Sequence, residues 1–181
     1  MFDLEKVIAG CKKNKRKSQI ALYEHYSSRL LGICARYVAN TSEAEDILQD
    51  AFIKIFKNIQ SYTGQGHFEG WMKKVVVNTA ITHFNREKKN YYHEEIENVN
   101  EDAVQLELSP DKEYDFVELN KMLTTMPEGY RLIFNLYAIE GYKHKEIAEK
   151  LNIEESTSKS QYLRAKQWII KEMKKLNWVN E

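Results

Sequence analysis

Apolar side chains recur at helical spacing through most of the first 90 residues of the chain. One series runs from residue 18 to residue 37 and comprises Ile20, Tyr23, Leu30, Leu31, Cys34 and Tyr37. A second lies in EAEDILQDAFIKIFKNI (43–59) and gives a wide apolar face of Ala44, Ile47, Leu48, Ala51, Phe52, Ile55 and Ile59. Asn40 and Thr41 interrupt the pattern, so we expect two helices, the second with Thr41 or Ser42 as its N-cap.

A glycine-rich stretch, SYTGQGHFEG (61–70), follows the second series and predicts a loop. The next segment, WMKKVVVNTAITHFNREKK (71–89), ends in a basic tail. Its three valines lower the helix propensity, but no turn residues bound them as a strand. We therefore expect a helix here.

The second half of the chain begins with a segment of little periodicity. Residues 94–112 contain Ser109-Pro110 and are typical of a linker. From Tyr114 onward the pattern predicts three or four helices, separated at Pro127, Gly129, Gly141 and Asn152. The expected fold is all-α, with two small helical domains joined by an acidic linker.

The formal net charge of zero hides a segregation of charge along the chain. Residues 94–118 hold ten acidic residues and one lysine; of the 27 acids and 27 bases in the chain, 17 acids and 26 bases therefore lie elsewhere. Two basic segments flanking an acidic one favour a nucleic-acid partner. No apolar run is long enough to cross a membrane. Cys11 and Cys34 have no metal-ligand spacing, and a reduced, cytoplasmic protein is the expectation. We expect no metal and no cofactor.

The segment EIAEKLNIEESTSKSQYLRAKQWI (146–169) has the pattern of a helix-turn-helix. Ile147, Ala148 and Leu151 form an apolar stripe on a short helix that should start near His144. Asn152 tolerates the left-handed conformation that ends a helix before a turn. A second helix should start between residues 154 and 157.

This second helix is a candidate for reading DNA in the major groove. Residues 156–175 contain six bases and one acid, and the exposed face combines hydroxyls with basic groups. Arg164 could donate two hydrogen bonds to guanine. The alternative is an amphipathic helix whose polar face is merely solvated. The expected DNA contacts are Ser156, Thr157, Lys159, Ser160, Gln161 and Arg164.

The residues GYKHKEIAEKLNIEESTSKSQYLRAKQWI (141–169) resemble the domain of bacterial sigma factors that reads the promoter −35 element. The likeness is greatest to the small extracytoplasmic-function type, and TMPEGYRLIFNLYAIEGY (125–142) is similar to the segment that precedes the motif in that family. Ser158 stands where many members carry an apolar residue.

The N-terminal half supports the same resemblance. SEAEDILQDAFIKIFKNI (42–59) is similar to the helix with which these factors dock on core RNA polymerase. Off its apolar stripe lies an acidic edge beside exposed apolar groups, which could pair with a basic coiled coil. A solvated helix face is the alternative. The expected polymerase contacts are Asp46, Gln49, Asp50, Ile53 and Phe56.

The segment YTGQGHFEGWMKKVVVNTAITHFNR (62–86) is similar to the family's −10 and promoter-melting region. A loop with aromatics, followed by a basic helix, can stack unpaired bases and hold their backbone. For Phe68 and Trp71 a place in the core is the alternative to base contact. The expected −10 contacts are Phe68, Trp71, Lys74, Asn78 and Arg86.

The resemblance implies a division into residues 1–93 for polymerase binding and −10 recognition, 94–112 as linker, and 113–181 for −35 recognition. It implies core RNA polymerase and promoter DNA as partners, with an anti-sigma factor as regulator and no membrane insertion. A stand-alone dimeric DNA-binding regulator is the rival interpretation, and the docking and melting segments count against it. An enzyme is disfavoured, because the sequence has no phosphate-binding glycine loop and no nucleophile or metal motif that would supply catalytic residues.

Overall fold

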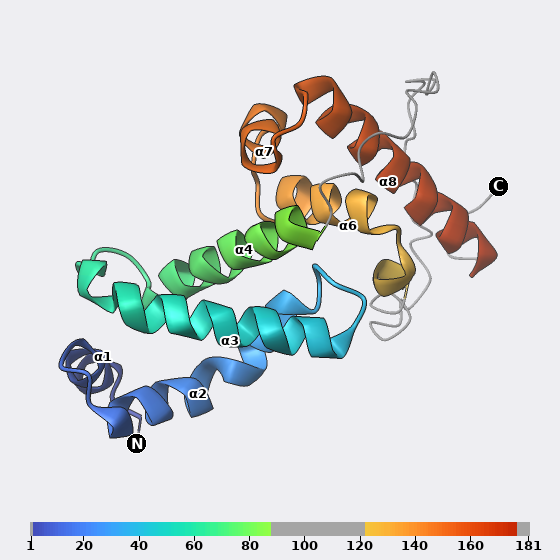
Figure 1. Cartoon of the computed structure of the whole chain (residues 1–181). Helices are drawn as coiled ribbons and strands as arrows, with labels where there is room; N and C mark the ends of the chain where they lie inside the picture. The colour runs from blue at the N-terminus through green and yellow to red at the C-terminus, as the bar shows by residue number, and fades with distance from the viewer. Residues whose placement is uncertain (1, 88–121, 177–181) are drawn as a thin grey trace. The chain divides into compact units, whose positions relative to one another are not determined.

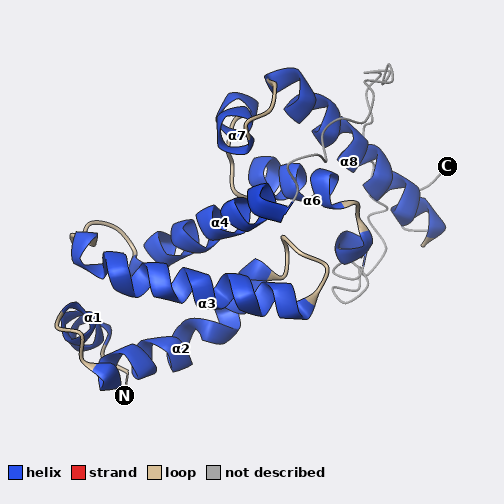
Figure 2. Ribbon diagram, viewed as in Figure 1, coloured by secondary structure: helices blue, strands red, loops and turns tan. Residues whose placement is uncertain are grey.

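The computed structural model describes residues 2–87 and 122–176, and every regular element within those ranges is helical (Figures 1 and 2). The chain divides into two compact units, Met1–Arg86 and Glu87–Glu181. The all-α expectation is confirmed for the part of the chain that is described, whereas the expected linker (94–112) lies outside it. The elements are α1 (Leu4–Lys12), α2 (Arg16–Cys34), α3 (Thr41–Asn58), the short 3₁₀ helix η1 (Ile59–Ser61), α4 (Phe68–Glu87), α6 (Glu128–Phe134), the π-helix η2 (Asn135–Ile139), α7 (His144–Leu151) and α8 (Glu155–Lys175).

Three features of the first unit differ from the sequence-based expectation. Helix α1 was not expected; Asp3 caps it by accepting a hydrogen bond from the backbone N–H of Lys6 at 3.2 Å. The N-cap of α3 is Asn40, one residue before the expected cap, and its side chain accepts from the backbone N–H of Ser42 at 2.9 Å. Helix α4 starts at Phe68, three residues early, because the apolar face of the helix already includes that ring.

The core of the first unit lies among α2, α3 and α4, which run side by side in Figure 1. Its buried side chains include Leu22, Leu30, Ile47, Ile55, Met72, Val76 and Phe84. Arg29 of α2 forms an ion pair with Glu69 in the first turn of α4. Its Nη1 donates to both carboxylate oxygens of Glu69 at 2.7 Å. This pair is exposed, so apolar burial rather than the ion pair accounts for most of the stability.

The second unit is built around the packing of α6 and α7 on α8. Leu132, Ile133, Leu136, Ile147, Leu151 and Ala165 form its buried core. The Arg131 guanidinium is also buried, and its Nη1 donates to the carbonyl of Thr124 at 2.7 Å. Residues 122–125 are helical, and Met122 packs with Met173 near the C-terminal end of α8.

Within residues 2–87 and 122–176, no helix is both long and apolar enough to cross a bilayer. Both cysteines are buried, and burial raises the pKa of the Cys34 thiol to about 12. A thiol that stays protonated at neutral pH is a poor nucleophile. This supports an inert packing role for Cys34.

Candidate nucleic-acid interfaces

Helices α7 and α8 form the expected helix-turn-helix. Helix α7 begins at His144 and α8 at Glu155, both where the sequence pattern predicted. Asn152 ends α7 with φ 54° and ψ 51°, the left-handed conformation that asparagine tolerates. The turn is further fixed by the backbone N–H of Ile153, which donates to the carbonyl of Ala148 at 3.1 Å.

The polar face at the start of α8 presents most of the residues expected to contact the −35 element. Ser156 and Lys159 are exposed, and Thr157, Ser160 and Arg164 are partly exposed. Lys159 Nζ also lies 2.8 Å from Glu155 Oε1, one turn earlier on the helix. These side chains share one face of a helix that could enter a major groove.

Gln161 differs from the rest of the expected set. Its side chain is only 8% exposed, on the inward side of α8 together with Ser158 and Ala165. In this structure Gln161 is therefore not presented to DNA. The 3.6-residue helical period explains the difference, because position 161 is three residues beyond the buried Ser158.

A cluster around His144 was missed in the sequence. Ser158 is fully buried, and its Oγ lies 2.9 Å from His144 Nδ1. The His144 ring stacks on Tyr137 with 4.2 Å between ring centroids, and the Tyr137 and Tyr162 centroids are 4.5 Å apart. The contacts hold the first turn of α8 against the start of α7. Buried polar groups require partners, so the serine at an apolar position was the signal that a polar neighbour should exist.

In the first unit, the loop before α4 is closed by Tyr62. Its hydroxyl donates to the carbonyl of Gly66 at 2.8 Å, and Gly64 and Gly66 both have positive φ. Its ring contacts Phe68 and Trp71, with centroid separations of 4.9 and 5.7 Å. The glycines therefore allow a tight loop over a small aromatic cluster.

The expected −10 residues fall into two groups. Phe68 is 3% exposed and Trp71 is partly buried, and the two rings stack with 5.5 Å between centroids. Lys74, Asn78 and Arg86 are exposed along α4. Because Lys74 and Asn78 are one turn apart, they lie on the same face. The structure thus presents Lys74 and Asn78 together on the surface, with Phe68 supporting the loop from inside.

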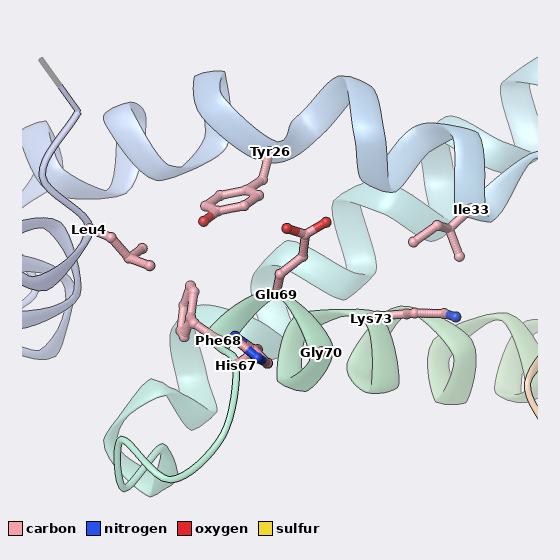
Figure 3. A pocket seen from close by; sticks show the side chains of 8 residues that line it. All are labelled: Leu4, Tyr26, Ile33, His67, Phe68, Glu69, Gly70 and Lys73. Carbon is pink, nitrogen blue, oxygen red and sulfur yellow. The ribbon is translucent and has the colours of Figure 1, made fainter.

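A hollow of about 430 Å³ lies beside the first turn of α4 (Figure 3). It is lined by Leu4, Tyr26, Ile33, His67, Phe68, Glu69, Gly70 and Lys73. In Figure 3 the Tyr26 ring and the Glu69 carboxylate approach each other across it. Burial, helped by the Glu69 charge and opposed by Arg29, raises the pKa of the Tyr26 phenol. At neutral pH this hydroxyl is thus a hydrogen-bond donor on one wall of the hollow.

Helix α3 carries a surface of a different kind. Asp46, Gln49, Asp50 and Ile53 are exposed and Phe56 is partly exposed, so the residues expected to contact polymerase share one face. Ile53 is a large apolar side chain that is 50% exposed.

Helix α2 adds two exposed apolar side chains that were not among the expected polymerase contacts. Ile20 and Tyr23 are 46% and 41% exposed. Tyr23 contacts Phe52 at 4.7 Å between centroids, and Phe52 in turn contacts Phe56 at 5.8 Å. We call Ile20, Tyr23, Ile53 and Phe56 the apolar docking patch. Ile20 and Tyr23 both belong to the apolar series expected for this helix, and the packing of α2 on α3 leaves them at the surface.

Among the described residues, no group of three or more His, Cys, Asp or Glu side chains is arranged to hold a metal ion. The side chains at these surfaces offer ionic contacts, hydrogen bonds and aromatic stacking. Those interactions suit the binding of nucleic acid and protein.

Two family models match the chain. Residues 22–90 match Sigma-70 region 2, and residues 116–169 match Sigma-70, region 4. The chain is 27% identical over 190 residues to the ECF RNA polymerase sigma factor SigW of Bacillus subtilis, with 96% of this chain and 98% of that protein covered. It is 25% identical over 175 residues to the ECF RNA polymerase sigma-E factor of Haemophilus influenzae, with 90% and 91% covered. A solved structure of the sigma factor RpoE in complex with the anti-sigma factor NepR, from Bartonella quintana, matches with a TM-score of 0.48 and 18% identity, covering 84% of this chain and 94% of that one.

Proposed function

The chain belongs to the extracytoplasmic-function group of the sigma-70 family, and from this premise we propose how its surfaces divide the work of promoter-specific initiation. It is a bacterial sigma factor, which binds core RNA polymerase and directs it to promoters. One observation carries this function. The same chain has an exposed acidic and apolar face on α3, followed by a helix-turn-helix at α7 and α8, which is the order of the two regions in the family.

The start of α8 reads the −35 duplex in this proposal. Arg164 donates to a guanine edge, while Ser156, Thr157 and Ser160 offer hydroxyls to bases or phosphates. Lys159 contacts a phosphate, exchanging its ion pair with Glu155 for a contact to DNA. Gln161 acts from the inside, by fixing the orientation of the helix.

Helix α4 and the loop before it hold the opened −10 strand. Asn78 reads an unpaired base, and Lys74 and Arg86 contact the strand's phosphates. Trp71 offers a partly exposed ring for stacking, at about 1–3 kcal/mol per base. Phe68 is buried and packs against the Trp71 ring. In this proposal Phe68 therefore has a core role and does not contact a base.

The apolar docking patch, together with Asp46, Gln49 and Asp50, binds core polymerase. Apolar groups at the centre and acids at the rim suit a basic helical partner, because the apolar contacts supply affinity and the charges steer association. Residues 1–93 form this docking and melting domain, 94–112 the linker, and 113–181 the −35 domain. The chain supplies no catalytic residue of its own and acts in the cytoplasm, where core polymerase is found.

An anti-sigma factor controls this activity in our proposal, as the family membership implies. Its predicted effect is competition, because an inhibitor that covers the apolar docking patch would prevent polymerase from binding there. Purified inhibitor should then lower the affinity of the chain for core polymerase.

A gel-shift assay tests the proposal against the rival, a stand-alone dimeric regulator. Duplex DNA carrying a promoter of this factor is incubated with the protein alone, with core polymerase alone, and with both. The proposal expects a specific complex only with both. Specific, tight binding by the protein alone as a dimer would support the rival.

A further inference from the structure

We propose that α1 is part of the −10 reading apparatus and that Lys12 is a positioning residue, holding the base-capturing loop in its binding conformation. The inference rests on the proposed role of residues 62–78 in binding the opened −10 strand. Helix α1 lies outside the region-2 match, which begins at residue 22.

The contact that carries the inference joins the end of α1 to the start of the loop. Lys12 Nζ donates to the backbone carbonyl of Tyr62 at 2.7 Å, across 50 positions of sequence, in a part-buried setting. In return, Gln60 Nε2 donates to the backbone carbonyl of Lys12. These reciprocal hydrogen bonds fix α1 to the 3₁₀ helix that leads into the loop.

Tyr62 is the residue on which the loop's shape depends. Its carbonyl is held by Lys12, and its hydroxyl closes the loop on Gly66 at 2.8 Å. Its ring meets Phe68 and Trp71 at the start of α4. One residue thus connects the anchor, the loop and the aromatic cluster.

Helix α1 is itself well anchored and can act as a support. Gly10 is buried against α2, where an added Cβ would collide with the Ser18 side chain. Cys11 is 1% exposed. At the other end of the helix, Phe2 stacks on His25 with 3.7 Å between centroids, and Leu4 forms a wall of the hollow beside Phe68. Helix α1 is therefore held firmly in place, and it carries the Lys12 side chain that reaches the loop.

Glycines at 64 and 66 make the loop intrinsically free to adopt other conformations. Capturing a particular unpaired base requires that the loop be ordered before the base arrives, because ordering it on binding reduces the affinity. Removal of the Lys12 contact should therefore weaken capture of the preferred base more than it weakens binding to polymerase. This outcome distinguishes positioning from a general contribution to stability.

The test uses the holoenzyme, formed from core polymerase and the full chain, on pre-melted promoter probes. One probe carries the preferred −10 non-template strand, and the others carry a single substituted base within it. The ratio of the affinities for preferred and substituted probes measures discrimination. Binding to core polymerase alone is measured in parallel by fluorescence anisotropy.

We expect Lys12→Met to reduce the discrimination ratio by about tenfold while leaving core polymerase affinity unchanged, which is the lower end of the effect of losing a hydrogen bond from a charged group. Lys12→Arg should retain most of the discrimination, since its guanidinium can donate to the same carbonyl. Gln60→Ala should reduce the ratio in the same direction. Lys13→Met removes the same charge from the neighbouring exposed position and should change nothing.

A discrimination ratio for Lys12→Met equal to that of the wild type would overturn the inference while leaving the proposed function in place. An equal loss in Lys12→Met and Lys13→Met would also overturn it, because it would point to general charge. If the wild type does not discriminate between the probes, the proposed −10 role fails and the inference fails with it.

Discussion

His144 Nδ1 lies 2.9 Å from Ser158 Oγ, so a hydrogen bond joins the first residue of α7 to the first turn of α8, the helix that we propose reads DNA. Ser158 is fully buried, and the His144 ring is stacked on Tyr137. A buried polar side chain thus has a polar partner at this position. The contact fixes the angle at which α8 leaves the turn.

Ser158→Ala should destabilise the second unit. The change removes one hydrogen bond and leaves a ring nitrogen without that partner, so we expect the free energy of unfolding to fall by about 1 kcal/mol. Chemical denaturation of the full chain measures this. Ser156→Ala, at an exposed position of the same turn, is the matched control and should stay within about 0.5 kcal/mol of the wild type. Equal stability of the two variants would contradict the account.

The same cluster predicts a pH dependence. Burial, and then the Lys159 charge, hold the pKa of His144 below its ordinary value of 6.5, with Glu155 acting in the opposite direction. In the interval between the folded-state and unfolded pKa values the unfolded chain binds more protons, so stability rises with pH there. The stability that neutral His144 contributes to the fold is fully present above about pH 6.5, and it is lost as the pH falls through the folded-state pKa of His144.

An NMR titration of the His144 ring in the full chain measures this pKa directly. It should lie below 6.5 in the wild type and move upward in Lys159→Met, because removing the nearby ammonium favours the imidazolium. A wild-type pKa above 6.5, or a downward shift in the variant, would be inconsistent with the structure.

Ile53→Asp should weaken binding to core polymerase without unfolding the protein. Ile53 is a half-exposed member of the apolar docking patch. A charge there must be desolvated on docking, and we expect a loss of about 1–3 kcal/mol, or roughly five- to 150-fold in affinity. Competition against a labelled sigma factor for core polymerase measures the loss. Ser28→Asp, which adds the same charge at an exposed site on α2 away from the patch, should bind like the wild type.

Asn78 and Lys74 should differ in the kind of DNA binding that they support. Asn78→Ala should reduce the preference for one −10 base by about 1–3 kcal/mol, since an amide can read a base edge. Lys74→Met should weaken binding to all pre-melted probes alike and lower the slope of log affinity against log salt by about 0.7. Holoenzyme binding to substituted probes at several salt concentrations separates the two effects. A uniform loss for Asn78→Ala would remove it from the set of base readers.

The helical pattern carried most of the information that sequence could give about this fold. The apolar period located α2, α3 and the helix-turn-helix, and Asn152 has the left-handed conformation expected of it. Helix α1 was missed although Leu4, Val7, Ile8 and Cys11 have helical spacing behind the Asp3 cap, because that apolar series is short. Such short series are weak signals without tertiary contacts.

The candidate surfaces were less predictable than the helices. A helical wheel separates two faces but cannot show which flank of a face a neighbouring helix covers. Gln161 thus lies inside, contrary to expectation, whereas Tyr23, a member of the apolar series on α2, is 41% exposed. The Lys12–Tyr62 contact joins residues 50 positions apart, and nothing local in the sequence indicates it.

The most direct test of the central claim is in vitro transcription from a library of promoter sequences, using purified bacterial core polymerase with and without this protein. The account predicts transcripts that appear only when the protein is present and whose templates share a −35 and a −10 element. Absence of polymerase-dependent transcripts, together with specific duplex binding by the protein alone, would contradict it and identify a stand-alone regulator.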